Sequence, residues 1–394
     1  MKKLQIETLI RYIQGLVAGE KGSELLKRFQ IHDASFTALE VMMALDKVIL
    51  KDVDMEKLKI ASNKLFNILY ETLSVTEKPK YPEGSILAHL VQDNQGIKEQ
   101  LADTRKYIKQ INREITPGAL AILQEHFDRI QLFTEHYAVM QNIVFPEIER
   151  GIKEHRCLQL MWAFHDDISM NIQKTLEELQ AEYFDLAQFN VASSKVYFAI
   201  NTILFREENV LFPIMFELLD ESSFPKMLHQ LREFKLAFSD TSAIQPNSNM
   251  AGTLSAASGP YHIQLSTGIL DIQQLELIFK NLPVDITFVD ENDEVKYFSS
   301  PEHRVFPRTT GIIGRKVQNC HPHESVHVVN QIVEAFKKGE KSEASFWIKM
   351  GAKYVLIKYF ALRDNAQAYR GVLEVSQEIS EIQKIRGERR LLDW

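Results

Sequence analysis

The chain has 394 residues, 45% hydrophobic and 25% charged, so it is long enough for two or three domains and too apolar for a disordered protein. Its 46 Lys and Arg against 53 Asp and Glu give a net charge of -7, which excludes a general basic surface for nucleic acid or an anionic membrane. Two distant cysteines, Cys157 and Cys320, exclude a disulfide framework and a cysteine-built zinc site. We therefore expect a cytoplasmic protein.

Residues 1–75 are predicted to form a small all-α domain whose task the sequence does not indicate. At the N-terminus, charges or amides interrupt the apolar residues every three or four positions, which is typical of an amphipathic helix and not of a signal peptide. A further helix is predicted after the capping candidate Asp54. No stretch reaches the roughly 18 apolar residues that cross a membrane, so no membrane association is expected.

Residues 84–238 are predicted to form a four-helix bundle. Amphipathic helical periodicity runs over four long segments, 85–112, 118–152, 156–184 and 191–219, and strand signals are absent from them. Two of the segments share a phrase, QNIVFPEIE at 141–149 and ENVLFPIMFE at 208–217. We interpret the bundle as two related helical pairs.

Each predicted helix of this bundle carries a polar side chain at a similar depth: His89, His136, His165 and the Glu207-Glu208 pair. An iron centre inside a bundle needs imidazole and carboxylate ligands that project inward from several helices. The distribution therefore suggests a metal site. The alternative is that these residues are ordinary polar groups of the core or the surface.

The phrases HYAVMQNIVFP, MWAFHDDI and REENVLFP resemble the hemerythrin-like HHE cation-binding domain. This domain occurs in bacterial proteins that also have an N-terminal domain of unknown function and a C-terminal PAS domain. The resemblance implies non-haem iron as the cofactor. It places His136, His165 and Glu208 at ligand positions of the family.

The first two helices depart from that family pattern. Gln141 stands where the family has a glutamate, so the anionic donor is lost. Ser85 and Ala88 stand where the first helix of the family has histidines, and His89 is displaced by one residue. We expect a weakened mononuclear iron site made by His89, His136, His165 and Glu208, or no metal at all.

Residues 239–268 are predicted to be a linker, and residues 269–394 an α+β domain. The stretch 241–270 contains no Asp, Glu, Lys or Arg and is rich in Ser, Ala, Gly and Asn. Beyond it follow a strand, an acidic turn and a second strand, then a helix ended by Gly339, and then three alternating strands. This order predicts a five-stranded antiparallel sheet with its helices on one face.

ELIFKNLPVDITFVDENDEVKYFS and FWIKMGAKYVLIKYFALRD resemble a PAS domain, the third part of the same bacterial family. The resemblance implies a sensor domain that encloses a small-molecule or gas ligand, or stays fully packed. It also implies a homodimer formed through the PAS domain and a signal passed to an unidentified protein partner.

The segment NCHPHESVH holds four side chains that can bind metals, but a turn and a helix start explain it equally directly. The PAS resemblance implies that His327 borders the cavity, where it is a candidate ligand for haem or another small molecule. Haem is less expected than non-haem iron, because bulky aromatic side chains can fill the cavity: Phe288, Phe298, Phe306, Trp347 and Tyr359.

These features predict a cytoplasmic sensor or regulatory protein that responds to oxygen, nitric oxide, redox state or a small ligand. No nucleophile motif or phosphate-binding loop occurs, so we expect no enzymatic activity. One alternative is a non-haem iron protein for iron handling or the repair of oxidative damage. Another is an interaction module in which both sensory folds are vacant.

Overall fold

The computed structural model describes residues 2–31, 36–50, 53–75, 77–241, 244, 262–265, 267–301, 304–321 and 323–388. The chain divides into two compact units, Met1–Ser248 and Asn249–Trp394. The first is mostly helical and the second is α+β, which confirms the predicted fold class at this level. The finer predicted boundaries, 1–75, 84–238, 239–268 and 269–394, stay predictions, and much of 239–268 lies outside the described residues.

The first unit begins with four helices: α1 (Lys2–Val17), α2 (Gly22–Phe29), α3 (Ala38–Ile49) and α4 (Met55–Ser74). The helix predicted after Asp54 is confirmed, because Asp54 Oδ1 accepts the backbone N–H of Lys57 at 2.9 Å and satisfies a donor of the first turn. Thr37 and Glu40 form a reciprocal capping box at the start of α3.

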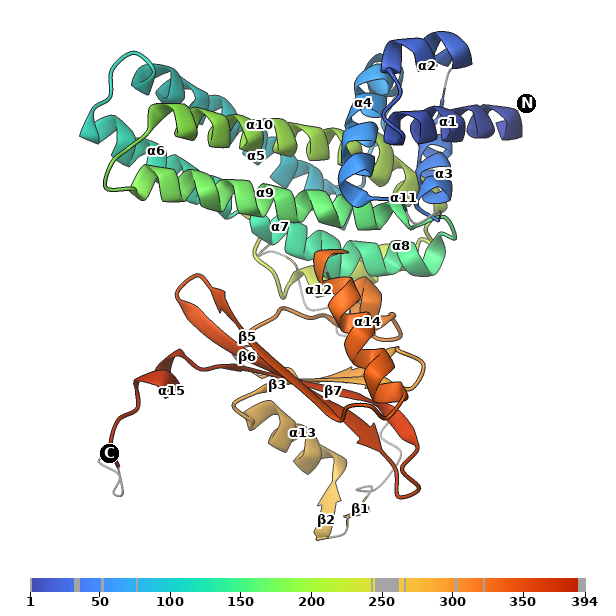
Figure 1. Ribbon diagram of the computed structural model, residues 1–394, viewed down its shortest axis with the longest axis vertical. Coiled ribbons are helices and arrows are strands. Elements are labelled where there is room, and N and C mark those ends of the chain that lie inside the picture. The colour runs from blue at the N-terminus through green and yellow to red at the C-terminus, as the bar shows by residue number, and fades with distance from the viewer. Residues whose placement is uncertain are drawn as a thin grey trace. The chain divides into compact units, whose positions relative to one another are not determined.

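Longer helices follow: α5 (Ile86–Ile111), α6 (Pro117–Gln131), α7 (Thr134–Val139), α8 (Phe145–Gly151), α9 (Cys157–Gln180), α10 (Leu186–Arg206), α11 (Phe212–Leu218) and α12 (Ser223–Leu231). Two short π-helices interrupt this series, η2 (Met140–Val144) between α7 and α8 and η3 (Glu207–Leu211) between α10 and α11. Helices α5, α6, α9 and α10 lie side by side (Figure 1). That these four form a hemerythrin-like bundle stays a prediction.

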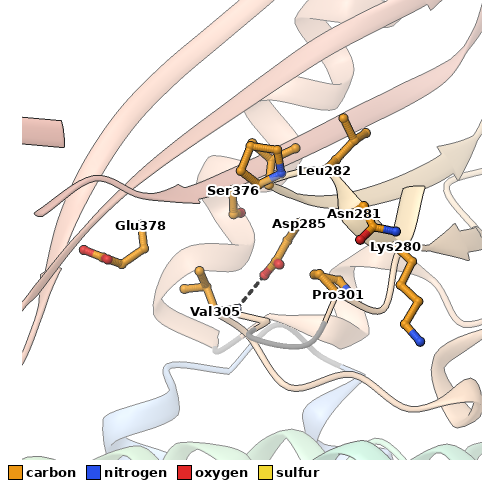
Figure 2. Close-up of a pocket in the computed structure, with 10 residues that line it drawn as sticks. Lys280, Asn281, Leu282, Asp285, Pro301, Val305, Ser376 and Glu378 are labelled. Carbon is orange, nitrogen blue, oxygen red and sulfur yellow. Dashed lines mark hydrogen bonds between the residues drawn. The ribbon is translucent and has the colours of Figure 1, made fainter. Parts of the chain in front are cut away.

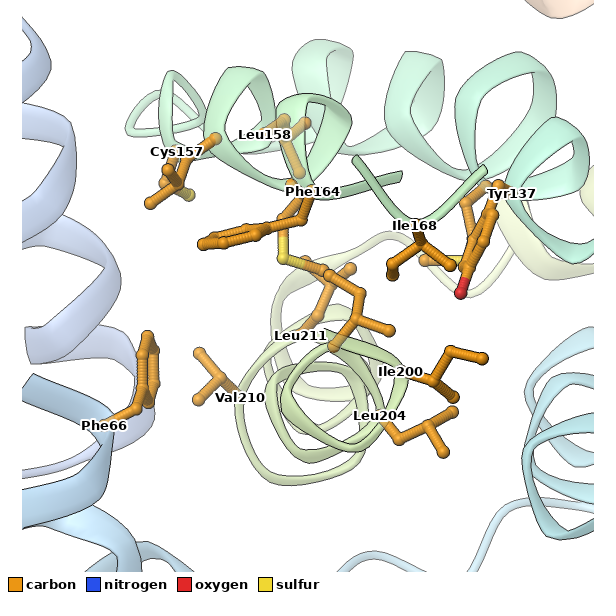
Figure 3. Close-up of a cluster of buried hydrophobic side chains, with 14 of the residues drawn as sticks. Phe66, Tyr137, Cys157, Leu158, Phe164, Ile168, Ile200, Leu204, Val210 and Leu211 are labelled. Carbon is orange, nitrogen blue, oxygen red and sulfur yellow. The ribbon is translucent and has the colours of Figure 1, made fainter. Parts of the chain in front are cut away.

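One hydrophobic core joins the first four helices to the longer ones. Figure 3 shows Phe66 of α4 facing Val210 of η3, with Phe164 of α9 and Leu211 close by. Each large apolar side chain buried in this way contributes about 1.5–3 kcal/mol to folding. Among the described helices, none has the length and apolar character that crossing a membrane requires.

The second unit begins with a hairpin, β1 (His262–Leu265) and β2 (Gly268–Asp271), of which β1 falls within the predicted linker. Helix α13 (Ile272–Asn281) follows. The predicted five-stranded antiparallel sheet is confirmed, in the order β4-β3-β7-β6-β5. Its strands are β3 (Asp285–Asp290), β4 (Val295–Phe298), β5 (Glu343–Met350), β6 (Lys353–Arg363) and β7 (Tyr369–Glu378). Two 3-10 turns, η4 (Thr310–Ile312) and η5 (Val317–Cys320), precede α14 (His323–Lys337), and α15 (Ser380–Lys384) follows β7.

The two faces of this sheet are covered by different helices. Phe336 of α14 packs with Val355 and Val372 on the inner face. Helix α13 lies on the opposite, outer side, where the ring of Phe279 is 5.4 Å from that of Tyr297 (Figure 1). The prediction that the helices share one face therefore holds for α14 but is wrong for α13. The alternation of residues in the strands does not show which face a preceding helix covers.

Candidate functional site

The structure brings His136 and His165 together between the long helices, next to Glu207. His136 comes from α7, His165 from α9 and Glu207 from the first position of η3. All three side chains are buried. His136 Nε2 is 3.3 Å from Glu207 Oε2, and His165 Nε2 is 3.9 Å from Glu207 Oε1. We call these three residues the histidine–glutamate cluster.

The other two predicted ligands have different partners. His89 Nδ1 lies 2.9 Å from the Ser239 hydroxyl. Glu208 forms ion pairs with Lys98, at 2.5 Å, and with Lys78, at 3.4 Å. Neighbouring residues of a helical turn point in different directions, so Glu207 faces the interior while Glu208 faces the lysines. Their predicted role as metal ligands finds no support in these contacts.

The two π-helices set the direction of the side chains around the cluster. The N–H of Phe145 bonds the carbonyl of Met140, and the N–H of Phe212 bonds the carbonyl of Glu207, both over five residues. A proline follows each phenylalanine and has no N–H to donate, which favours a wider turn just before it. The repeated Phe-Pro phrase, interpreted above only as a sign of two related helical pairs, is a sequence signal that could have indicated these turns.

Two carboxylates hold the His136 ring from opposite sides. Nδ1 lies 3.0 Å from Asp93 Oδ2, while Nε2 faces Glu207. Asp93 Oδ1 in turn accepts the backbone N–H of Phe238 at 2.6 Å, and Asn94 donates to Glu207 Oε2 at 3.0 Å. Hydrogen bonds therefore fix the orientations of His136 and Glu207.

The surroundings shift the pKa values of the two imidazoles in opposite directions, so one ring is charged and the other is neutral. Burial by itself lowers the pKa of His136, but Glu207 and Asp93 outweigh it and raise the pKa to about 9. Burial, and then the charge on His136, hold the pKa of His165 well below its usual value. At neutral pH and without metal, His136 is therefore an imidazolium and His165 is neutral.

Two atoms of the cluster lack hydrogen-bond partners. His165 Nε2 and Glu207 Oε1 are fully buried, face each other and make no hydrogen bond. The ring of Tyr137 stacks on that of His165 with 4.3 Å between centroids, and Gln141 Nε2 lies 3.4 Å from His165 Nδ1. A buried polar atom left unpaired costs about 1–3 kcal/mol, so a cation or a hydrogen-bonding group between the two atoms would be stabilised.

The donor atoms suit one transition-metal ion in kind, because two imidazoles and a carboxylate are ligands of non-haem iron. They are not yet arranged as a formed site: within the described residues, no group of three or more His, Cys, Asp or Glu side chains is placed to hold a metal ion. The proton on His136 also competes for the nitrogen that a metal would need. Metal binding would therefore require loss of that proton and a small rearrangement.

Side chains of helix α4 contact two residues that lie next to the cluster in the sequence, Arg206 and Asp167. Arg206, which precedes Glu207, is 3% exposed, and its guanidinium donates to Ser62 Oγ at 3.0 Å and Asn63 Oδ1 at 2.7 Å. Burial lowers the pKa of Arg206 to about 9. Lys59 Nζ reaches Asp167 Oδ2 at 2.6 Å, two residues beyond His165. The N-terminal helices thus fix the segments that carry Glu207 and His165.

In the second unit, His327 is exposed on α14, and no described contact turns it toward the sheet. Trp347, expected to help fill the interior, is 69% exposed on β5. Successive strand residues face opposite sides, and Trp347 falls on the outer one. Tyr359 is buried on the inner face, as expected.

Polar residues on the inner face of the sheet were missed by the sequence reasoning. Glu374 and Ser376 of β7 are buried, and they face Thr287 and Asp285 of β3 across the β3–β7 ladder. Strict alternation puts Val372 on one face with Glu374 and Ser376, and Leu373 and Val375 on the other, so the pattern alone does not show which face is buried. The pairing register of the strands, which the sequence does not state, was needed to find them.

The comparisons with known proteins concern the second unit. Residues 275–380 match the PAS domain family. A C-terminal domain from Streptococcus mutans is 32% identical, and the match covers 33% of this chain and 100% of that one, with a TM-score of 0.31. No curated protein matches the chain.

Two sensor histidine kinase structures are more distantly similar. A sensory box kinase from Vibrio cholerae is 12% identical, with 27% of this chain and 89% of that one covered and a TM-score of 0.22. The sensor region of another is 17% identical, with 25% and 40% covered and a TM-score of 0.20. By this family match, the chain contains a PAS domain at residues 275–380.

Proposed function

We propose that this protein is a sensory or regulatory protein. The PAS domain at residues 275–380 is the observation that carries the proposal. Its sheet has a helix-covered inner face where a ligand can be enclosed and an outer face that can meet a partner. A change on one face can be transmitted to the other through the strands that both faces share.

The histidine–glutamate cluster is the second input of the proposed sensor. Its support is the pair of buried, unpartnered atoms, His165 Nε2 and Glu207 Oε1. A group that satisfies both atoms stabilises the state of the helices in which they face each other. Because Arg206 and Lys59 connect the same segments to α4, such a change would also reach the N-terminal helices.

Non-haem iron is the cofactor we propose for this cluster, within a hemerythrin-like bundle. His136, His165 and Glu207 would hold it, and a bound iron would supply open coordination positions for oxygen or nitric oxide. Asp93 keeps the His136 ring in place through Nδ1, and Asn94 fixes the Glu207 carboxylate. With three protein donors and a competing proton, we expect weak binding of one ion per chain.

Isolation without oxygen tests the iron proposal. We expect up to one iron per chain and an optical spectrum that changes when oxygen is admitted. The variant Gln141→Glu, which adds a carboxylate beside His165, should retain more iron because it adds an anionic donor near the cluster. No iron in either protein, with no spectral response, would reject the metal site and leave the PAS-based proposal standing.

We further propose that the PAS domain forms a homodimer through the outer face of its sheet and passes the signal to a protein partner. The supporting observation is the exposed side chain of Trp347 on this face of the edge strand β5. A symmetric contact between two copies would remove this surface from water.

A further inference from the structure

A pocket of about 370 Å³ opens where β3 begins and β7 ends. Its walls are residues 280–285, Pro301 and Val305 from the segment after β4, and Ser376 and Glu378 from β7. Figure 2 shows Asp285 near the middle, with Ser376 beside it and Val305 opposite. The volume falls at the small end of the range of about 300–1,000 Å³ found for ligand sites.

Two polar side chains inside this pocket are almost completely buried. Asp285 is 4% exposed and Ser376 is 1% exposed. They are cross-strand partners in the β3–β7 ladder, so both side chains project from the same face. Ser376 lines the pocket, and its buried hydroxyl has no hydrogen-bond partner. Such a hydroxyl favours any ligand that can bond to it.

The carboxylate of Asp285 is held in a fixed orientation. Its Oδ2 accepts the backbone N–H of Val305 at 2.7 Å. Burial raises the pKa of Asp285, an effect that Arg304 and the backbone donors oppose. Arg304 is itself engaged, since it donates to the Phe306 carbonyl at 2.8 Å and to Thr287 Oγ1 at 3.1 Å. A further cation at the Asp285 carboxylate would therefore be favourable.

The charges that line the pocket are two carboxylates, Asp285 and Glu378, and one amine, Lys280. Figure 2 shows the Lys280 side chain extending away from Asp285 and Ser376. At the centre, the ionised Asp285 carboxylate can only accept hydrogen bonds, and the Ser376 hydroxyl can accept or donate one. Pro301 and Val305 form an apolar part of the wall. This combination fits a ligand with a cationic donor group and a short hydrocarbon part.

We propose that this pocket binds a small organic cation whose ammonium group donates hydrogen bonds to the Asp285 carboxylate and the Ser376 hydroxyl. The inference names the ligand class for the proposed sensory function and rests on that function for its biological use, while the binding itself does not depend on it.

The position of the pocket connects the ligand to the end of the sheet. Two residues after Ser376, Glu378 Oε1 accepts the backbone N–H of Ser380 at 2.7 Å, and Ser380 begins α15. A ligand that contacts Asp285 and Ser376 therefore lies beside the strand end that leads into α15. Changes in pocket occupancy would be transmitted to this C-terminal helix.

Three probes of nearly equal size and different charge test the proposal on the full-length chain: n-butylammonium, n-butanol and butyrate. Saturation-transfer NMR titrations should detect binding of the cation with clearly higher affinity than the other two. Asp285→Asn should weaken cation binding about tenfold or more, because a hydrogen bond to a charged group contributes about 1.5–3 kcal/mol. Ser376→Ala should weaken it severalfold without harming the fold, since Ser376 Oγ makes no bond in the protein.

Glu334→Gln is the matched control, because Glu334 is an exposed carboxylate on α14 outside the pocket. It should bind n-butylammonium like the native protein. Failure of the native protein to bind the cation, equal binding of butanol or butyrate, or native affinity in both pocket variants would overturn the site. Intact cation binding without any downstream response would instead refute the sensory function and leave the site in place.

Discussion

The proton on His136 predicts how the stability of the metal-free protein depends on pH. The pKa of His136 is about 9 in the folded chain, against an ordinary value of 6.5 when unfolded. Because the folded value is the higher one, protonation stabilises the fold. This contribution is fully present below about pH 6.5 and is lost as the pH rises through about 9. A difference of about 2.5 pKa units corresponds to about 3 kcal/mol.

Urea unfolding between pH 6 and pH 10, in the presence of a chelator and followed by helical circular dichroism, measures this contribution. The variant His136→Gln keeps a side chain that can donate to Glu207 but cannot carry the charge. The stability gap between native protein and variant should shrink by about 3 kcal/mol from the low to the high end of this range. A gap that stays constant with pH would refute the assignment of the proton to His136.

Three further variants test the packing around the two sites. Gly96→Ala places a Cβ 2.1 Å from the Phe238 Cβ, and the backbone N–H of Phe238 donates to Asp93. We expect this variant to lower the free energy of unfolding by about 1–3 kcal/mol in urea. An unchanged unfolding midpoint would contradict the close packing of Gly96 against Phe238. Lys59→Met leaves Asp167 without its cation and should lower the free energy of unfolding by about 1–3 kcal/mol, whereas unaltered stability would show that α4 is not anchored there. Trp347→Glu should convert the proposed dimer to a monomer in light scattering, and a native protein that is monomeric at every concentration would remove the basis for that prediction.

Local signals were sufficient to predict several elements of the fold. Asp54 marks the start of α4. Gly339 lies two residues after the end of α14, where its positive φ of 76° is a conformation that glycine adopts readily. Ser85 is the N-cap of α5, where its hydroxyl accepts the N–H of Ala88 at 3.2 Å. At these two positions, where the hemerythrin-like resemblance leads one to expect histidines, Ser85 caps the helix and Ala88 supplies the capped N–H. Caps and periodicity act over a few residues, which is why they can be recognised in a single sequence.

The site residues depend on contacts between distant segments and were only partly predictable. His136 and His165 were expected as candidates, and the structure brings them together. Glu207 rather than Glu208 faces them, because the direction of a side chain at a π-turn depends on the exact turn and not on the average period. Asp285 and Ser376 were missed because their burial depends on which face of the sheet α14 covers.

Metal binding by variants of two neighbouring carboxylates tests whether Glu207 and the two buried histidines form a metal site. Metal-free protein titrated with Co²⁺ under inert gas reports coordination through its visible absorption. We expect that Glu207→Gln abolishes the absorption of the bound ion and that Glu208→Gln, which loses its ion pairs with Lys98 and Lys78, retains it. Retention in Glu207→Gln, or equal loss in both variants, would show that Glu207 is not a metal ligand.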